Sequence, residues 1–389
     1  MPLAFTASAA RAPLSLSTLL NIALLGTRGI PASYSGFETA VEALSVRLVA
    51  RGHRVTVYRR THHYDGDRAT EYRGVRLVNL PTIPSKYLDT MVHSTLSGLH
   101  ALGSRYDAAV YFIAGNSPVC WIPRLVGTPV AINVDGLDWR RKKWPAAAKA
   151  FIKWAERISR HTANVVVTDS RAVQDFYTST YQFTPRFIPY GADIARVPAG
   201  DTLRRFGLEP GKYLLFVGRL VPENCVEHLV AAFRGLSTDF RCVIVGDAPY
   251  ADAYQASLRS LAADDPRIVF TGYLFGEGYR ELGSNSYAFV ETSEVGGTHP
   301  ALLEAMAMGA AVIVNGTVEN RETIGTAGLA YASAGGAEAL RPLLEQLLAD
   351  PVARDRWAAA AAARAEAVYS WDAVTDQYEA LCRELAGRQ

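Results

Sequence analysis

Short apolar runs rich in β-branched residues recur along the chain, and segments with helical spacing of apolar positions separate them. This alternation is typical of parallel sheets whose strands are joined by crossover helices. The pattern predicts a first series of strands at 21–25, 55–58, 75–77, 108–112, 130–132 and 165–167. It predicts a second series at 213–217, 242–245, 268–270, 288–290 and 311–314. We therefore expect an α/β protein.

Two successive βαβ series suggest two similar domains rather than one long sheet. A chain of 389 residues also exceeds what a single hydrophobic core usually supports. Proline and glycine mark the passage between the series, at 188–193 and 208–211. We predict a loose N-terminal extension (1–20), a Rossmann-like N-terminal domain (21–193), a Rossmann-like C-terminal domain (194–369) and a final helix (370–389) with Ser370 as its N-cap. The sequence leaves open which domain that helix packs on.

Composition narrows the range of partners. Hydrophobic residues make up 49% of the chain and charged residues 20%, an ordinary globular mixture. The formal net charge is +2, so binding to a polyanion would need a local basic cluster. The four cysteines are scattered without a CxxC pair, which argues against a zinc or disulfide framework and suits a cytoplasmic location. No apolar run approaches the roughly 20 residues needed to span a bilayer.

The first predicted strand is followed by a glycine-rich loop, GTRGIPASYSGFET, at 26–39. Glycine lets backbone N–H groups approach a ligand, and a helix N-terminus favours negative or oxygen-rich groups. The glycine spacing differs from the GxGxxG fingerprint of dinucleotide-binding folds, which argues against NAD. We assign Gly29 to donor binding, and Gly36 and Glu38 to acceptor binding. A tight turn without a ligand is the alternative.

In the second series, Arg219 lies just past the strand at 213–217, in the sequence GRLVPEN. A guanidinium at the C-terminal end of a strand can bind a diphosphate through two N–H groups and stabilise its charge as a glycosidic bond breaks. We expect Arg219 to act in catalysis and, with Asn224, in donor binding. The alternative is a surface ion pair between Arg219 and Glu223, which would contribute little.

Gly296, Gly297 and Thr298 form a turn that opens a further helix, with Pro300 in its first turn. Proline is tolerated there because its missing N–H would have no intrahelical partner. The free N–H groups and the positive end of the helix can hold a phosphate, so the turn is assigned to donor binding. Glu304 lies about one turn further on, and its carboxylate can accept two hydrogen bonds from ribose hydroxyls. A surface acid without a ligand is the alternative.

Candidate acceptor-side residues follow two strands of the first series. Asp135 can orient an acceptor hydroxyl or act as its base, and Arg140 can hold a phosphate of donor or acceptor. A plain Asp-Gly turn is the alternative for Asp135. Asp169 can contact the acceptor or N-cap the next helix. Tyr190, at the domain junction, can line a hinge between the domains or contact a sugar.

The segment 139–160 begins with Trp-Arg-Arg-Lys-Lys-Trp and continues as a helix with four cations along one stripe. A basic helix flanked by tryptophan suits an anionic membrane surface, where each cation contributes roughly 1 kcal/mol. An ordinary solvated helix face is the alternative. The sequence has no pattern for base-stacking aromatics on a sheet or for a helix-turn-helix, so nucleic acid is not an expected partner.

The segment 62–67, HHYDGD, contains a histidine pair and an Asp-x-Asp sequence. Asp-x-Asp holds divalent cations in transferases of a different fold. A site for such a hard cation needs more converging oxygens than this segment offers, and its polar residues are typical of a surface turn. We predict a turn without a metal.

Several stretches of the chain resemble bacterial family-4 glycosyltransferases of the GT-B fold, and within them a rhamnosyltransferase-type subgroup. The resemblance runs in order from about residue 21 to the final helix. The matching stretches are 26–39 (with Ser35 where glycine is usual), 133–144, 169–177, 188–192, 218–224, 245–250 and 295–309. It implies an α/β fold with two Rossmann-like domains facing across a cleft.

The same resemblance implies a retaining, metal-independent transferase without a cofactor beyond its nucleotide-sugar donor. The implied donor is dTDP-L-rhamnose or another dTDP- or UDP-linked sugar. The implied acceptor is a saccharide or a lipid-linked sugar, such as a polyprenyl-diphosphate N-acetylhexosamine, in cell-surface polysaccharide synthesis. The location is then the cytoplasm, with a peripheral contact at the inner face of the membrane.

The chain departs from the family pattern at two positions. Most family-4 enzymes carry two glutamates eight positions apart, and Gly296 stands eight positions before Glu304. The carboxylate that usually holds donor-sugar hydroxyls is therefore missing, and Glu294 or backbone amides are the candidates to replace it. Asn224 stands near the family's usual lysine. The rhamnosyltransferase-type subgroup shares both departures, which points toward a deoxysugar donor.

Three alternative functions stay open. The chain can be a GT-B transferase for another UDP- or GDP-sugar, a sugar-nucleotide 2-epimerase with the same two-domain cleft, or a non-catalytic subunit that binds a nucleotide sugar. An epimerase would isomerise the donor alone, whereas a transferase needs an acceptor.

Overall fold

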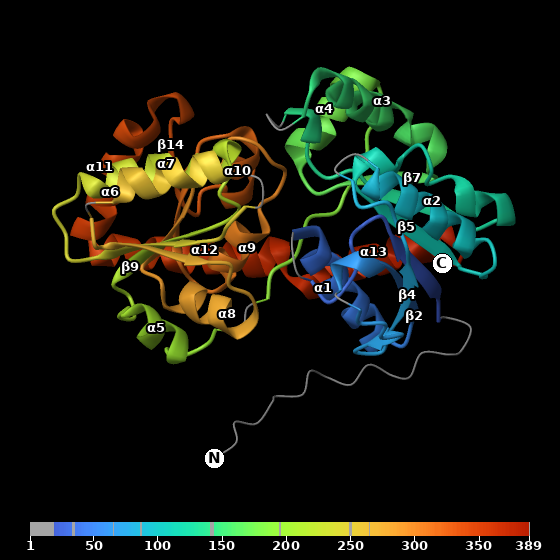
Figure 1. Cartoon of the computed structure of the whole chain (residues 1–389), viewed down its shortest axis with the longest axis horizontal. Helices are drawn as coiled ribbons and strands as arrows, with labels where there is room; N and C mark the ends of the chain where they lie inside the picture. The colour runs from blue at the N-terminus through green and yellow to red at the C-terminus, as the bar shows by residue number, and fades with distance from the viewer. Residues whose placement is uncertain are drawn as a thin grey trace, which may run out of the picture.

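The structure is a computed structural model of the 389-residue chain. It describes residues 19–32, 36–64, 66–85, 88–140, 144–193, 196–248, 251–263 and 265–388. Their strands form two separate sheets, one of eight strands and one of six. Figure 1 shows the two sheets as the centres of two domains, the C-terminal domain on the left and the N-terminal domain on the right. The predicted α/β class with two sheets is confirmed.

The N-terminal sheet has the strand order β3-β4-β2-β1-β5-β6-β7-β8, and only the β3–β4 pair is antiparallel. The central strands are buried along most of their length, which explains why they read as continuous apolar runs. The strands are β1 (Asn21–Leu25), β2 (Arg54–Arg60), β3 (Glu71–Tyr72), β4 (Val75–Leu80), β5 (Ala108–Phe112), β6 (Val130–Asn133), β7 (Val165–Thr168) and β8 (Arg186–Phe187).

Helices cover both faces of this sheet because β1 is apolar on both sides. Ile22 and Leu24 pack in one core with α1, while Ala23 and Leu25 pack in a second core with α4. The helices and turns of the domain are α1 (Gly36–Ala50), η2 (Thr61–His63), α2 (Asp89–Ala101), η3 (Ala114–Asn116), η4 (Ile122–Val126), η5 (Asp138–Arg140), α3 (Ala146–Thr162) and α4 (Arg171–Tyr181).

The C-terminal sheet is parallel throughout, with the order β11-β10-β9-β12-β13-β14. Its strands are β9 (Tyr213–Val217), β10 (Arg241–Val245), β11 (Ile268–Gly272), β12 (Ala288–Glu291), β13 (Ala311–Asn315) and β14 (Leu329–Tyr331). Strand order reverses between β9 and β12, and the loops after these two strands diverge to opposite faces. Open α/β sheets bind ligands at such a switch point, outside the carboxyl ends of the strands.

The helices of the C-terminal domain surround this sheet. They are α5 (Asp201–Phe206), α6 (Val226–Arg234), α7 (Asp252–Ala262), α8 (Gly276–Asn285), α9 (Pro300–Ala307), α10 (Val318–Ile324), α11 (Gly336–Ala349) and α12 (Pro351–Tyr369), with the turns η6 (Pro222–Asn224) and η7 (Ser333–Gly335). A last helix, α13 (Trp371–Leu385), follows α12 directly.

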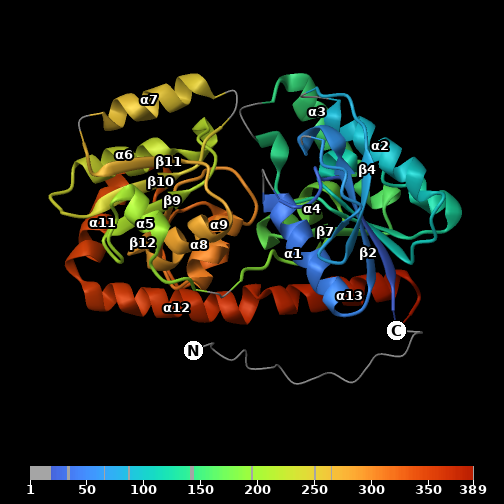
Figure 2. The same cartoon turned by 60° about the horizontal axis from the view of Figure 1, so that its bottom comes forward.

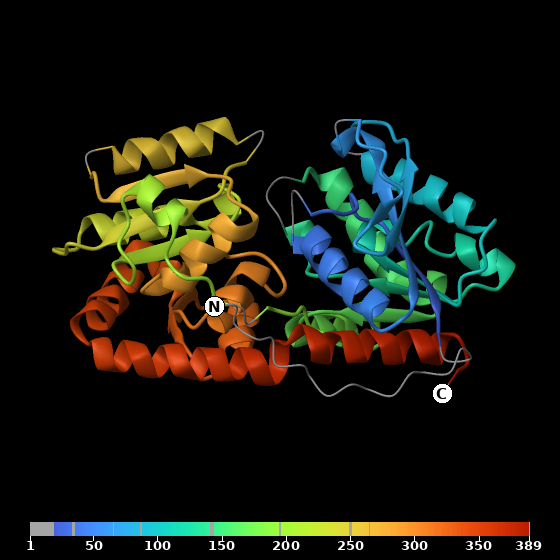
Figure 3. The ribbon, with the colours of Figure 1, turned by 90° about the horizontal axis from the view of Figure 1, so that it is seen from below.

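α12 and α13 lie end to end beneath the two domains (Figures 2 and 3). α12 packs on the C-terminal domain through α9 and β13, whereas α13 packs on α1 and β5 of the N-terminal domain. The chain thus crosses between the domains twice, and the amide of Ala192 donates to the carbonyl of Tyr369 at 2.7 Å where the two crossings meet. The final helix therefore completes the N-terminal domain.

Each predicted strand is present, and Ser370 is the N-cap of α13, where its hydroxyl accepts from the amide of Ala373 at 3.3 Å. The pattern missed β3, β8 and β14, which have only two or three residues each and so carry no periodicity. Most of the predicted N-terminal extension, residues 1–18, lies outside the described residues. Among the helices described, none is long and apolar enough to cross a membrane.

Candidate functional site

A cavity of about 2100 Å³ opens between the two domains. A site for one small ligand commonly measures roughly 300–1,000 Å³, so this cavity has room for a donor and an acceptor. Loops that follow the strands of both sheets line it. The predicted site residues on its wall are Gly36, Glu38, Asp135 and Tyr190 from the N-terminal domain and Arg219, Asn224, Gly296, Gly297, Thr298 and Glu304 from the C-terminal domain.

Arg219 lies on the loop that leaves β9 at the switch point, and this loop is braced from two sides. The Asn224 side chain donates to the carbonyl of Arg219 at 2.8 Å. The amide of Glu294, from the loop after β12, donates to the carbonyl of Glu223 at 2.9 Å. Glu223 is only 3% exposed, unlike the surface acid of the alternative interpretation. The fold therefore presents the Arg219 guanidinium on a fixed loop at the cavity wall.

The turn at Gly296–Thr298 faces the cavity, but Thr298 is already bound across the domain boundary. Its amide donates to Asp169 Oδ2 and its hydroxyl donates to the Asp169 carbonyl, both at 2.9 Å. Thr298 therefore positions the turn, and its amide is not available to a phosphate while this contact holds. The amides of Gly296 and Gly297 are the ones that remain for a ligand.

Asp169 is buried at the domain junction and does not line the cavity. The interpretation of Asp169 as an N-cap is wrong, because the cap position of α4 falls on Ser170. Glu322 from α10 supplies the capping oxygens, which accept from the amides of Arg171 at 2.8 Å and Ala172 at 3.0 Å. Burial and the nearby Asp135 carboxylate raise the pKa of Asp169.

Three glycines allow the loops of the two domains to touch. A Cβ atom on Gly36 would lie 2.7 Å from Pro300 Cγ, and one on Gly136 would lie 2.6 Å from the amide nitrogen of Gly297. A Cβ on Gly297 would lie 2.9 Å from Asp169 Oδ2. Gly36, at the end of the glycine-rich loop after β1, therefore packs against Pro300 at the start of α9, although the two residues lie 264 positions apart in sequence.

Glu304 has the partner that a partly buried carboxylate requires. The hydroxyl of Tyr279, from α8, donates to Glu304 Oε2. Burial raises the pKa of Glu304, and the hydrogen bond from Tyr279 acts in the opposite direction. Tyr279 also lines the cavity, and sequence reasoning missed it because a single tyrosine in a helix belongs to no motif.

Asp135 is held in place by a chain of hydrogen bonds. Its backbone has φ 57°, and its amide donates to Asn133 Oδ1 at 2.9 Å. Asn133 Nδ2 donates to the hydroxyl of Tyr378 at 2.8 Å, and the Tyr190 hydroxyl donates to Asp135 Oδ1 at 3.4 Å. The Asp135 backbone is left-handed, a conformation that aspartate tolerates in turns, and the residue also lines the cavity. Tyr378, from the final helix, had no signal in the sequence.

Gly29 and Arg140, like Asp169, lie off the cavity wall. Gly29 has φ 112°, and a Cβ atom there would lie 2.7 Å from Arg59 Cγ, so packing against Arg59 accounts for the glycine. Arg140 pairs with Glu319 of α10 at 3.6 Å and lies over the Trp139 ring. Arg140 thus links the domains, while residues 141–143 of the basic segment lie outside the described residues.

Each domain matches a known protein family. Residues 211–350 match the family described as "Glycosyl transferases group 1", and residues 20–193 match a domain of unknown function. Alpha-D-kanosaminyltransferase of Streptomyces kanamyceticus is 25% identical over 284 residues, which cover 67% of this chain and 72% of that protein.

Two solved structures superpose on nearly the whole chain. Sucrose-phosphate synthase from Thermosynechococcus elongatus has a TM-score of 0.82 at 21% identity and covers 95% of this chain and 99% of that chain. Anabaena HepE in complex with UDP-glucose has a TM-score of 0.75 at 16% identity and covers 93% of this chain and 99% of that chain.

The chain has the GT-B fold, and its residues 211–350 match the glycosyl transferases group 1. The expected fold, two Rossmann-like domains facing across a cleft, is confirmed. In this GT-B chain, the segment that matches the glycosyl transferases group 1 carries Arg219, the Gly296–Gly297 turn and Glu304. The segment 20–193 carries Asp135 and the glycine-rich loop.

Proposed function

We propose that the protein transfers a sugar from a nucleoside-diphosphate sugar to a saccharide or lipid-linked acceptor, and that it retains the anomeric configuration. The observation that carries this proposal is the meeting of three loops at one cavity. Arg219 and the Gly296–Gly297 turn flank the switch point of the C-terminal sheet, and Asp135 faces the same cavity from the other domain. The UDP-glucose in the HepE structure supports a donor of this class.

The C-terminal wall provides the groups that a donor needs. Arg219 offers a planar set of N–H donors for the diphosphate, and the free amides of Gly296 and Gly297 offer further donors. Thr298, tied to Asp169 at 2.9 Å, keeps that turn in position. We assign the ribose hydroxyls to Glu304, whose carboxylate is oriented by Tyr279 in the free protein.

The N-terminal wall provides the acceptor side. We propose that Asp135 orients the acceptor hydroxyl, which attacks the anomeric carbon from the face that the diphosphate leaves. The bond from carbon to the diphosphate oxygen breaks, and its electron pair stays on that oxygen. The acceptor proton passes to the leaving diphosphate or to Asp135. Arg219 and the turn amides neutralise the leaving charge, so the transfer step needs no divalent cation.

L-Rhamnose from a dTDP-linked donor is our preferred sugar, on the resemblance of the sequence. The packing around Gly296 is consistent with the absence of the glutamate that usually stands eight positions before Glu304. A Cβ atom on Gly296 would lie 2.6 Å from His299 Cε1. A glutamate at this position would have to displace His299. The donor is therefore expected to be held at Gly296 by backbone groups, which suits a deoxysugar with a different hydroxyl pattern.

We propose that the protein works in the cytoplasm and docks on anionic membrane through the segment 139–160. Phe151 and Trp154 on α3 are 38% and 50% exposed, and Lys153 and Arg157 are exposed beside them. Phe151 also lines the cavity, so docking on this side would bring a lipid-linked acceptor to the site. Sedimentation with phosphatidylglycerol vesicles should carry the wild-type chain and not F151S/W154S, while neutral vesicles carry neither.

A panel of nucleotide sugars tests the proposal directly. The purified chain is incubated with each sugar, with and without an N-acetylglucosamine-diphosphate lipid, and the products are read by mass spectrometry. We expect an increase of one deoxyhexose on the acceptor with dTDP-rhamnose, and loss of product in D135N. Isomerised donor without acceptor would favour the epimerase. Binding of donors without any turnover would favour the non-catalytic subunit.

A further inference from the structure

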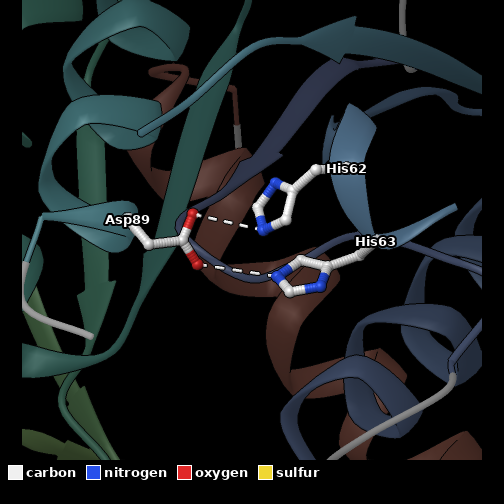
Figure 4. Close-up of side chains that lie close together, drawn as sticks. All are labelled: His62, His63 and Asp89. Carbon is white, nitrogen blue, oxygen red and sulfur yellow. Dashed lines mark ion pairs between the residues drawn. The ribbon is translucent and has the colours of Figure 1, made fainter. Parts of the chain in front are cut away.

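Two imidazoles and a carboxylate converge on the N-terminal wall of the cavity (Figure 4). His62 and His63 come from η2, directly after β2, and Asp89 is the first residue of α2. His62 Nε2 lies 3.9 Å from Asp89 Oδ1, and His63 Nε2 lies 3.5 Å from Asp89 Oδ2. One ligand atom from each of the three residues lies within 4.8 Å of the other two.

Hydrogen bonding does not account for this convergence. Both separations are too long for good hydrogen bonds between nitrogen and oxygen. His63 Nε2 and Asp89 Oδ1 are buried and have no hydrogen-bond partner among the residues that the structure describes. Buried polar atoms are nearly always satisfied by a partner, so these two atoms call for a ligand that both can bind.

The separations suit a metal ion. A tetrahedral ion with bonds of about 2.0–2.1 Å holds its ligand atoms about 3.3–3.4 Å apart, so the 3.9 Å between His62 Nε2 and Asp89 Oδ1 would need a contraction of about half an ångström. We propose that His62, His63 and Asp89 form a three-ligand site for a divalent transition-metal cation of the Zn²⁺ type. Two imidazole ligands disfavour Mg²⁺ and Ca²⁺, which prefer oxygen.

Arg60 orients the Asp89 carboxylate through a hydrogen bond. Arg60 is 3% exposed, and its Nη1 donates to Asp89 Oδ2 at 2.7 Å, which leaves Oδ1 for the ion. Hydrogen bonds of this kind orient ligating carboxylates. The guanidinium charge opposes the cation, so we expect weaker binding than at a closed site with four protein ligands.

The site is open toward the cavity, because all three ligand residues line it. The remaining coordination positions would therefore hold water or an anionic oxygen of a molecule in the cavity. The site belongs to the N-terminal domain, whereas Arg219 and Glu304 belong to the C-terminal domain. The proposed metal site is thus separate from the residues assigned to the nucleotide, and metal binding can be measured without any donor or acceptor present.

The sequence analysis predicted no metal here. Asp89 lies 26 positions after His63 and outside the Asp-x-Asp segment, so no sequence motif joins the three residues. Within that segment, Asp67 pairs with Arg59 at 3.0 Å, and Asp65 lies outside the described residues. The predicted turn from 62 to 67 therefore contributes its histidines, and not its aspartates, to the cluster.

Metal binding to the tag-free, full-length chain tests the proposal. The protein is stripped with a chelator, dialysed against Zn²⁺ or Co²⁺, and analysed by elemental mass spectrometry and by visible absorption of the Co²⁺ form. His62 is exposed, so H62A/H63A should fold, and its thermal unfolding is compared with wild type. Asp89 is left intact because its partner Arg60 is buried. H161A controls for the loss of a surface histidine.

A second cluster, formed by Cys225, Glu227 and His228, must be separated from the first. We therefore expect one equivalent of Zn²⁺ in the wild type, in H161A and in C225S. H62A/H63A should bind at least about 100-fold more weakly and lose the Co²⁺ absorption bands. Unchanged stoichiometry and affinity in a folded H62A/H63A would overturn the proposal. So would loss of the metal in C225S alone, or no saturable binding in the wild type.

Discussion

Gly136 offers a sharp test of whether the two domains must meet closely for transfer. Its added Cβ would lie 2.6 Å from the Gly297 amide nitrogen, whereas ordinary contacts begin at 3.4 Å. The Gly136→Ala variant must therefore separate the two loops by about 0.4 Å to reach the shortest contacts that Cβ atoms make, and by about 0.8 Å to reach an ordinary contact. A misplacement of about 1 Å can slow an enzyme about 10²-fold, which corresponds to roughly 2.7 kcal/mol of transition-state stabilisation.

We expect kcat/KM of G136A to fall about 10²-fold in the transfer assay, with the donor and acceptor identified by the panel. Gly115→Ala is the matched control, because Gly115 lines the same cavity and its added Cβ would have no atom within 4 Å. Neither glycine has a positive φ, so backbone strain does not separate the two variants. Equal rates for G136A and G115A would refute the requirement for close domain contact.

Four further predictions follow from single side chains. R219A should lower the transfer rate about 10²-fold or more if the guanidinium stabilises the leaving diphosphate, and near-normal turnover would reject that role. Y279F removes the donor to Glu304 and should lower the free energy of unfolding by about 1–3 kcal/mol in urea titrations. E322A removes the oxygens that cap α4 and should destabilise by about 1–2 kcal/mol in the same assay. Burial raises the pKa of Glu156 from 4.5 to about 7, so the folded protein binds a proton more tightly than the unfolded chain, and stability falls between about pH 4.5 and 7. E156Q should therefore raise the free energy of unfolding at pH 8 by up to about 3 kcal/mol, which is seen as a higher melting temperature. At pH 4.5 it should change the melting temperature little.

The sheets were predictable because buried parallel strands require continuous apolar runs, as at β1 and β9. The loops of the site were predictable because open α/β sheets bind ligands at the carboxyl ends of their strands, where glycine lets the backbone approach a ligand beside a helix N-terminus. Arg219 and the Gly296–Gly297 turn lie where this reasoning placed them, on the cavity wall. Their roles toward a ligand stay predictions.

Contacts between segments far apart in sequence could not be predicted. Asp169 suits an N-cap by residue type, but its Oδ2 accepts from the Thr298 amide, and Glu322 of α10 supplies the oxygens that cap α4. Arg140 had the charge for a phosphate, but the position of α10 provides Glu319 as its partner. The hydroxyl of Tyr279 reaches Glu304 only because α8 and α9 pack together.

A crystal structure of the protein with a bound nucleoside diphosphate, dTDP or UDP, would show whether Arg219 and the Gly296–Gly297 turn hold the diphosphate. We expect phosphate oxygens within about 2.7–3.2 Å of the Arg219 guanidinium and of the Gly296 or Gly297 amide. We also expect the ribose hydroxyls to bind Glu304. A diphosphate bound on the N-terminal wall, or bound in the cavity without contact to Arg219, would contradict the account.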